Sequence, residues 1–206
     1  MLYEYLQKNY KPNEPIFVSD IDLDVSSNYL RQMFKVLCDE GKIKRYDTGI
    51  YYLPGKSRLK GGVAIAPSEV ARYKYISRNG SVEGYYSGYT FANQLGLTTQ
   101  VPFIIEIVSN SASAKCREVK VKEQRVILRK PKVKITKDNY RVLQFLDLLK
   151  DVEIYTDEEN EDARDLIVKF ILNNSITMEM LNCYIGLYPD KVYRNLYEMR
   201  LYNVFA

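Results

Sequence analysis

Residues 26–54, SSNYLRQMFKVLCDEGKIKRYDTGIYYLP, change from a helical to an extended pattern, and this change decides the fold of the N-terminal part of the chain. Ser26 or Ser27 is suited to cap a helix that runs to Glu40 and ends at Gly41. The apolar residues of this helix share one face because their spacing follows the helical repeat: Leu30, Phe34, Leu37 and Cys38.

Two extended segments follow this helix. KIKRY and IYYL are separated by Asp47, Thr48 and Gly49, a three-residue connection with glycine where a positive φ is needed, which predicts a hairpin. Upstream, residues 2–9 predict a first helix, and Ser19 is suited to cap a short second helix. A helix, a short helix, a longer helix and a hairpin in this order are typical of the winged helix-turn-helix.

The polar face of the longer helix carries side chains suited to DNA. Arg31 and Gln32 can make bidentate contacts to guanine and adenine edges, and the hydroxyl and basic side chains near them can hold phosphates. The predicted DNA-binding residues are Ser26, Ser27, Asn28, Arg31, Gln32, Lys35, Lys44, Arg45, Tyr46 and Thr48. The alternative is a solvated face or a protein-contact surface, since residues 1–56 have no net charge to attract DNA.

Charge is distributed unevenly along the 206 residues. Residues 1–56 carry no net charge, residues 57–150 carry +10 and residues 151–206 carry −6, which gives the net +4 of the chain. We expect a winged-helix DNA-binding domain at 1–56, a basic α/β domain at 57–150 and an acidic helical extension at 151–206 that packs on it. The predicted fold class is α+β, with an N-terminal winged helix-turn-helix, a mixed sheet-and-helix domain and a helical C-terminal tail.

The sequence contains no histidine, and this limits the chemistry available to the protein. Without histidine there is no Ser-His or Cys-His nucleophile and no histidine metal ligand. Cys38, Cys116 and Cys183 are too far apart to predict a zinc site or a disulfide framework. No apolar run is long enough to span a membrane, and the first residues lack a signal-peptide pattern. We therefore expect a cytoplasmic protein with no metal, no cofactor and no membrane partner.

The block YYSGYTFANQLGLTTQVPF, residues 85–103, is rich in hydroxyl, amide and glycine groups. Its apolar residues have helical spacing and predict a helix capped by Ser87 and ended by Gly96. The polar side chains are then caps and turn formers, or they contact a partner.

Residues 102–137 alternate apolar and basic side chains. FIIEIVS and two segments within CREVKVKEQRVILRKPKVKI predict a meander of at least three strands with one apolar and one basic face. The basic face is either solvated surface or an electropositive surface for a nucleic acid or an acidic partner.

Four segments in a fixed order carry a family resemblance: GIYYLP at 49–54, APSEVA at 66–71, YYSGYTFANQLGLTTQVP at 85–102 and the basic stretch after them. This series resembles the AbiEi-type antitoxin family of abortive-infection, type IV toxin–antitoxin pairs. The resemblance implies a winged-helix repressor that binds double-stranded DNA at inverted repeats in its own operon. It also implies that the 57–150 domain neutralises a nucleotidyltransferase-like toxin, directly or through the toxin's target. Inverted repeats are compatible with a homodimer of the protein on the DNA.

Two groups of side chains are candidates for contact with the toxin or its target. They come from the 85–103 block and from the basic strands: Tyr86, Tyr89, Asn93, Thr99, Gln100, Lys120, Lys122, Arg125 and Arg129. One alternative to an antitoxin is a standalone DNA-binding regulator or adaptor with an unknown sensing domain. Another is a magnesium-dependent nuclease in which Glu106 and Glu118 bind the metal and Lys120 activates water. We expect no enzymatic activity and assign no catalytic residue.

The residues after 138 predict four helices. The first covers 139–150, the second lies around 163–171, Ser175 opens the third, and Pro189 starts a fourth whose apolar stripe includes Tyr197. The acidic run DEENEDARD at 157–165 is expected in the exposed first turn of a helix, where carboxylates suit the helix dipole. The alternative is that it contacts a basic toxin or the protein's own basic sheet.

Overall fold

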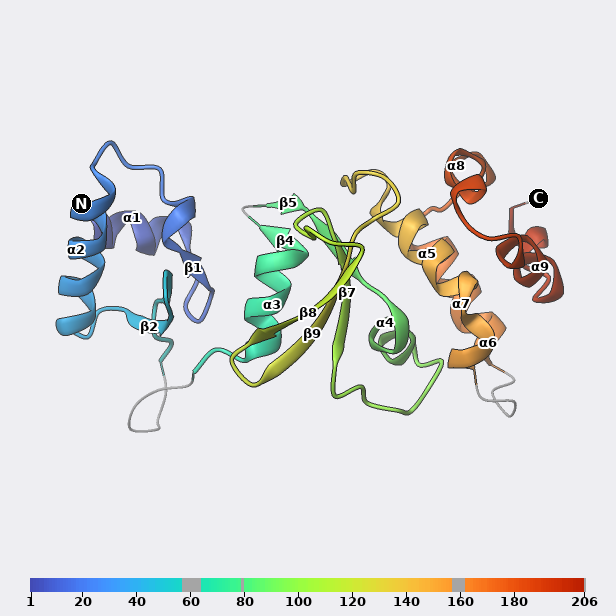
Figure 1. The fold of residues 1–206 in the computed structure, drawn as a ribbon, viewed down its shortest axis with the longest axis horizontal. Helices are drawn as coiled ribbons and strands as arrows, with labels where there is room; N and C mark the ends of the chain where they lie inside the picture. The colour runs from blue at the N-terminus through green and yellow to red at the C-terminus, as the bar shows by residue number, and fades with distance from the viewer. Residues whose placement is uncertain (57–63, 79, 157–161, 206) are drawn as a thin grey trace. The chain divides into compact units, whose positions relative to one another are not determined.

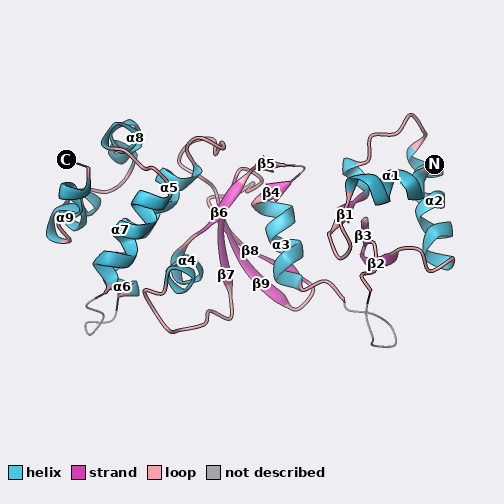
Figure 2. Cartoon of the chain, turned by 180° about the vertical axis from the view of Figure 1, so that it is seen from behind, coloured by secondary structure: helices cyan, strands magenta, loops and turns pink. Residues whose placement is uncertain are grey.

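The computed structural model describes residues 1–56, 64–78, 80–156 and 162–205. These residues form helices and small sheets in two compact units, Met1–Val70 and Ala71–Ala206 (Figures 1 and 2). The prediction of an α+β protein is confirmed. Within the described part of the chain, none of the helices combines the length and the apolar character needed to cross a membrane.

The first unit has one helix before and one helix after a short strand. Its elements are α1 (Leu2–Asn9), β1 (Ile16–Phe17), the 3-10 turn η1 (Val18–Asp20), α2 (Ser27–Asp39), β2 (Lys44–Asp47) and β3 (Ile50–Tyr52). The strands form an antiparallel sheet in the order β1-β3-β2. Leu6 of α1 and Phe34 of α2 are completely buried, so both helices contribute to one small apolar core.

Local signals in the sequence place α2 correctly. Ser26 caps the helix by accepting a hydrogen bond from the Tyr29 backbone N–H at 3.3 Å. Gly41 follows the helix with φ of 70°, a left-handed conformation that favours glycine.

Two details of the first unit differ from the prediction. The short second helix is the 3-10 turn η1, which begins after Phe17, so Ser19 lies inside it and does not cap it. The hairpin connection consists of two residues, Thr48 and Gly49, because Asp47 still belongs to β2. A register shift between Arg45 and Asp47 absorbs the additional residue in β2.

The second unit is built on a four-stranded sheet. That sheet is formed by β6 (Gly84–Tyr86), β7 (Ile105–Ser109), β8 (Cys116–Val121) and β9 (Gln124–Arg129), while β4 (Ser77–Arg78) and β5 (Ser81–Val82) form a separate two-stranded sheet. The helices of the second unit are α3 (Pro67–Tyr75, which begins in the first unit), α4 (Gly88–Leu95), α5 (Tyr140–Lys150), α6 (Val152–Tyr155), α7 (Ala163–Asn173), α8 (Met178–Tyr184) and α9 (Lys191–Glu198), with 3-10 turns η2 (Ile185–Leu187) and η3 (Leu201–Val204). Helices α4 to α9 lie on the same side of the sheet (Figure 1).

The four-stranded sheet has the order β6-β7-β9-β8, so the predicted meander is wrong. Strand β9 lies between β7 and β8, and it pairs in parallel with β7. The reason is burial: Val126 and Leu128 of β9 are completely buried, whereas most of β8 is exposed. A central position covers both sides of the more apolar strand and leaves the basic strand at the edge.

The register of β7 and β9 decides which side chains share a face. Val108 pairs with Arg129, and Glu106 lies two residues before Val108, so these three point to one face of the sheet. Ile107 and Leu128 are also paired and point to the opposite face. The face with Glu106 and Arg129 is therefore the more polar of the two.

Helix α5 lies at the centre of the larger core. Phe145 and Leu146 are completely buried and belong to a cluster that also contains residues of α4, α7, α8 and α9. Helix α8 is capped by Thr177, which accepts a hydrogen bond from the Met180 N–H at 3.2 Å, so Ser175 does not open this helix as predicted. Tyr197 of α9 is 78% exposed and is not part of the core stripe.

The predicted acidic first turn falls only partly on described residues. Residues 157–161 lie outside them, so their part of the prediction is not addressed by the structure. Helix α7 begins at Ala163 with Asp162 in the N-cap position, which places a carboxylate next to the positive end of the helix dipole.

Candidate functional site

Helix α2 presents the polar side chains that the sequence predicts for DNA contact. Leu30, Phe34 and Leu37 are buried and fix the rotation of the helix on its core. The opposite side is consequently solvent-exposed, and it carries six of the predicted residues: Ser26, Ser27, Asn28, Arg31, Gln32 and Lys35. Their spacing places the last four on one continuous stripe of the helix.

The β2–β3 hairpin adds three of the other four predicted residues. Arg45 and Thr48 are exposed and Lys44 is half-buried. The Arg45 guanidinium donates to the Asp47 carbonyl and to the Thr48 hydroxyl, each at 3.4 Å, which holds it along the hairpin. Tyr46 is only 6% exposed and points into the core, so its predicted contact with DNA is wrong: alternation along the strand turns it inward between Arg45 and Asp47.

Two apolar side chains on α2 were not predicted. Tyr29 is 50% exposed and Val36 is 53% exposed. They lie seven residues apart, two helical turns, so both lie on the side of Gln32. The sequence contains a signal for them: Tyr29 and Val36 do not follow the helical spacing of the buried apolar residues, so they are expected outside the core.

The 85–103 block is largely structural. Tyr86 is half-buried, and its carbonyl accepts a hydrogen bond from the Gln144 side chain at 2.8 Å. Tyr89 packs edge-on against Tyr155 with ring centroids 5.0 Å apart. The Asn93 side chain donates to the Thr98 carbonyl at 3.2 Å.

Only part of this block is exposed. Thr99 and Gln100 are exposed, and they precede Val101 and Phe103, which are 84% and 75% exposed. Tyr89 and Asn93 of the helix thus hold the fold, while Gln94 and the loop after the helix present the surface of the block.

The predicted basic strand residues divide into two kinds. Arg125 is paired with Glu118 through two hydrogen bonds of 2.6 and 2.8 Å, and Arg129 donates to Glu106 at 2.9 Å. Lys120 and Lys122 are exposed, with Lys122 at the β8–β9 turn. The arginines are thus partly neutralised by their own sheet, whereas Lys120 and Lys122 are solvent-exposed at its edge.

Glu106 fixes the start of α4 in place of the predicted cap. Its carboxylate accepts a hydrogen bond from the Tyr89 N–H at 3.2 Å as well as from Arg129. Ser87 occupies the N-cap position but makes no capping hydrogen bond, so its predicted capping role is wrong. Gly88 has φ of 56°, and a Cβ at this position would collide with the Glu106 carboxylate. A carboxylate distant in sequence therefore satisfies the helix N-terminus.

The alternative nuclease site is not assembled as a metal pair. Glu106 on β7 and Glu118 on β8 both flank Ile127 of β9, which separates their backbones by two strand spacings, roughly 10 Å. Each carboxylate is engaged by an arginine, as described above. Among the described residues, no group of three or more His, Cys, Asp or Glu side chains is placed to hold a metal ion.

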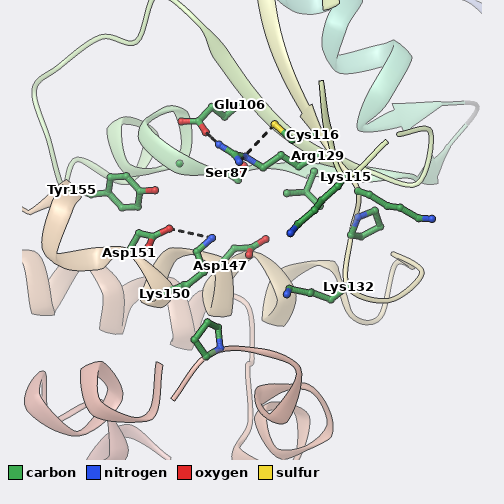
Figure 3. A pocket seen from close by; sticks show the side chains of 15 residues that line it. Ser87, Glu106, Lys115, Cys116, Arg129, Lys132, Asp147, Lys150, Asp151 and Tyr155 are labelled. Atoms are coloured by element: carbon green, nitrogen blue, oxygen red, sulfur yellow. Dashed lines mark hydrogen bonds and ion pairs between the residues drawn. The ribbon is translucent and has the colours of Figure 1, made fainter. Parts of the chain in front are cut away.

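A pocket of about 440 Å³ opens beside the polar face of the sheet (Figure 3). It is lined from β7, β8 and β9, from the segments before β8 and after β9, from the start of α4, from helices α5 and α6 and from Pro189. Its charged side chains are Glu106, Lys115, Arg129, Lys130, Lys132, Asp147, Lys150 and Asp151. The sequence prediction contained only Arg129 and, in the nuclease alternative, Glu106, because the others come from a loop and from helix positions without a recognisable motif.

Asp147 has the least usual environment in the pocket. It accepts a hydrogen bond of 2.7 Å from the Tyr85 hydroxyl. Burial raises the pKa of Asp147, although the Tyr85 hydrogen bond and the positive charges of Lys150, Lys132 and Arg129 act in the opposite direction. Burial also raises the pKa of Tyr85, and the charge of Asp147 raises it further, so this hydroxyl stays a hydrogen-bond donor.

Asp151, at the other end of the pocket, behaves differently. Burial alone would raise the pKa of Asp151, but hydrogen bonds from Lys191 and Lys150 outweigh it and lower the pKa. The Lys191 amino group lies 2.6 Å and the Lys150 amino group 3.1 Å from this carboxylate. Asp151 is thus an ionised carboxylate held between two amino groups, and this fixes the start of α6 against α9.

The chain matches the model of DUF6088, described as a family of unknown function, over residues 3–175. Because this match covers most of the chain, the protein belongs to that family. None of the curated proteins matches the sequence. The family match does not connect the chain to AbiEi-type antitoxins, so that resemblance stays a prediction.

Proposed function

We propose that this member of the DUF6088 family is a DNA-binding transcriptional repressor of its own operon and the antitoxin of a toxin–antitoxin pair. In this proposal the first unit is a winged helix, α2 is its recognition helix and the β2–β3 hairpin is its wing. The element order of the unit and the sheet order β1-β3-β2 are compatible with that arrangement.

The observation that carries the DNA-binding proposal is the exposed stripe of Asn28, Arg31, Gln32 and Lys35 on α2. Arginine and glutamine can read guanine and adenine edges in the major groove, and lysine can hold a phosphate. Val36, exposed on the same helix, offers an apolar contact of the kind that reads a thymine methyl. Arg45 and Thr48 on the hairpin can contact the backbone beside the groove.

Binding to the DNA upstream of the operon tests this assignment. We expect Arg31→Ala to weaken specific binding by about 1–3 kcal/mol, measured by fluorescence anisotropy at fixed salt. Lys8→Ala is the matched control, because Lys8 is an exposed cation on α1 that the proposed interface does not use. If both variants lost the same DNA affinity, only overall charge would matter, and this would contradict α2 as a recognition helix.

The antitoxin part rests on the resemblance of the 85–102 block to AbiEi-type antitoxins. Co-expression with a nucleotidyltransferase-like protein encoded beside this gene should rescue growth. The triple variant Arg31→Ala, Lys35→Ala and Arg45→Ala should lose repression of a promoter reporter but keep rescue, because the proposed toxin-neutralising residues lie in the second unit. Loss of rescue in a folded triple variant would contradict this division of labour.

A second candidate is a standalone regulator whose second unit senses a ligand. The pocket beside the sheet favours it, because a regulator that responds to a small molecule needs a binding cavity of this kind. Absence of a nucleotidyltransferase-like reading frame beside the gene would favour this candidate over the antitoxin.

A further inference from the structure

The carboxylates of the pocket already have partners. Glu106 is bound to Arg129 and to the start of α4, and Asp151 is bound to two lysines. Asp147 accepts the Tyr85 hydroxyl, and a raised pKa means that it repels an anion less than an ordinary aspartate does. The negative charge that lines the pocket is therefore largely compensated within the protein.

Three of the five basic side chains of the pocket are not compensated in the same way. Lys115, Lys130 and Lys132 make no ion pair with any residue that the structure describes. Lys115 precedes β8 and Lys132 follows β9, and the two segments are joined by a hydrogen bond of 3.2 Å from the Lys130 N–H to the Lys115 carbonyl. Figure 3 shows the amino groups of Lys115 and Lys132 pointing into the pocket, toward Asp147.

A buried hydroxyl also lines this pocket without a hydrogen-bond partner. Ser87 is only 6% exposed, and its Oγ has no partner within hydrogen-bonding distance. Leaving a buried polar group unpaired costs about 1–3 kcal/mol, so such groups are rare in folded proteins. A ligand in the pocket would supply the missing partner.

We propose that the pocket binds a small phosphorylated molecule of about the size of a nucleoside monophosphate. The amino groups of Lys115 and Lys132 would bind the phosphate, since lysine ammonium groups are strong donors to phosphate oxygens. Tyr155, whose pKa is raised mainly by burial, supplies a neutral hydroxyl donor at another wall of the pocket. The volume of 440 Å³ lies within the roughly 300–1,000 Å³ of small-molecule sites. This site is separate from the proposed DNA-binding residues and does not depend on them.

Isothermal titration of the full chain with AMP, inorganic phosphate and adenosine tests the proposal. We expect AMP and phosphate to bind and adenosine to bind more weakly than AMP, because the phosphate carries the recognition. Lys132→Ala should lower the affinity for AMP about tenfold or more, as expected for loss of one charge-assisted hydrogen bond. Lys134→Ala is the matched control, since Lys134 is equally exposed, two residues away and outside the pocket lining.

Ser87→Ala separates a ligand site from a structural role. The substitution removes a hydroxyl that has no partner, so the melting temperature of the free protein should be unchanged or higher, while the affinity for AMP falls. A lower melting temperature together with unchanged affinity would show that Ser87 serves the fold alone and would contradict its part in the site.

Three outcomes would overturn the proposal as a whole. The first is the absence of AMP and phosphate binding. The second is binding of AMP that Lys132→Ala and Lys134→Ala weaken equally. The third is binding of oligonucleotides that depends on Lys132 while AMP does not bind, which would make this region a nucleic-acid surface.

Discussion

The two units of this protein place their candidate side chains in opposite ways. In Met1–Val70 the candidate residues project outward from α2 and its hairpin. In Ala71–Ala206 charged residues from strands, loops and helices converge on a pocket. An outward-facing site on one helix depends on local sequence, because helix periodicity alone selects its residues. A converging site depends on the tertiary fold, because its residues are far apart in the chain.

The largest expected effect tests whether the two units have independent cores. Phe34 and Phe145 are both completely buried, one in each unit. We expect Phe34→Ala and Phe145→Ala each to cost about 3–5 kcal/mol of unfolding free energy in its own unit. Calorimetry combined with limited proteolysis should show that each variant loses protection only in the unit that carries the change. If either substitution made both units unfold in a single transition, the two cores would not be independent.

The next effect concerns Gly88, where the second unit depends on a contact distant in sequence. Gly80→Ala is the control: Gly80 also has a positive φ, but its Cβ would meet no atom within 4 Å, so only backbone strain of about 1–2 kcal/mol is expected. Gly88→Ala should lower the unfolding free energy by about 1–3 kcal/mol more than Gly80→Ala does. The reason is that the Glu106 carboxylate can make room for a Cβ only by giving up its hydrogen bonds. Urea unfolding measures both, and equal costs would refute a structural role for Glu106 at the start of α4.

A smaller effect tests the local character of α2. Ser26→Ala removes the capping oxygen and should cost about 1 kcal/mol of unfolding free energy in the first unit. Ser27→Ala changes an exposed neighbour inside the helix, where alanine is the better helix former, so the unfolding free energy should be unchanged or higher by a few tenths of a kcal/mol. If Ser27→Ala lowered the thermal stability more than Ser26→Ala does, the cap would be Ser27 and the helix would begin one residue later.

The smallest effect is the pH dependence that Asp147 gives to the second unit. Burial raises the pKa of Asp147 above its ordinary value of 3.8, so the folded state binds more protons than the unfolded state in the interval between the two values. The unfolding free energy should therefore decline as pH rises through that interval and stay lower above it. Asp147→Asn should remove this part of the decline in urea unfolding from acidic to neutral pH. Parallel pH curves for the two proteins would contradict a raised pKa.

Much of the secondary structure follows from the sequence because its signals are local. The cap at Ser26, the glycines after α2 and α4, and the apolar spacing of α5 each act within a few residues. The errors occur where a long-range contact competes with a local one. Ser87 has the right position for a cap, yet Glu106 takes the role because strand β7 brings its carboxylate to the Tyr89 backbone N–H in the first turn of α4.

The candidate sites show the same division. The candidate residues on α2 could be predicted from periodicity. Tyr46 of β2 was predicted wrongly, because the side of the hairpin that a residue faces is decided by strand pairing, and this pairing contains a register shift. The pocket could not be predicted, because Lys115, Lys132 and Asp147 belong to different segments with no motif in common.

The sequence by itself determined the α+β composition, the positions of the main helices and the polar stripe on α2, because periodicity and capping are properties of neighbouring residues. Only the tertiary structure decided the strand order, the capping of α4 by Glu106 and the pocket that brings Lys115 and Lys132 together. Burial selects β9 as the central strand, and that choice brings the segments at the ends of β8 and β9 against α5.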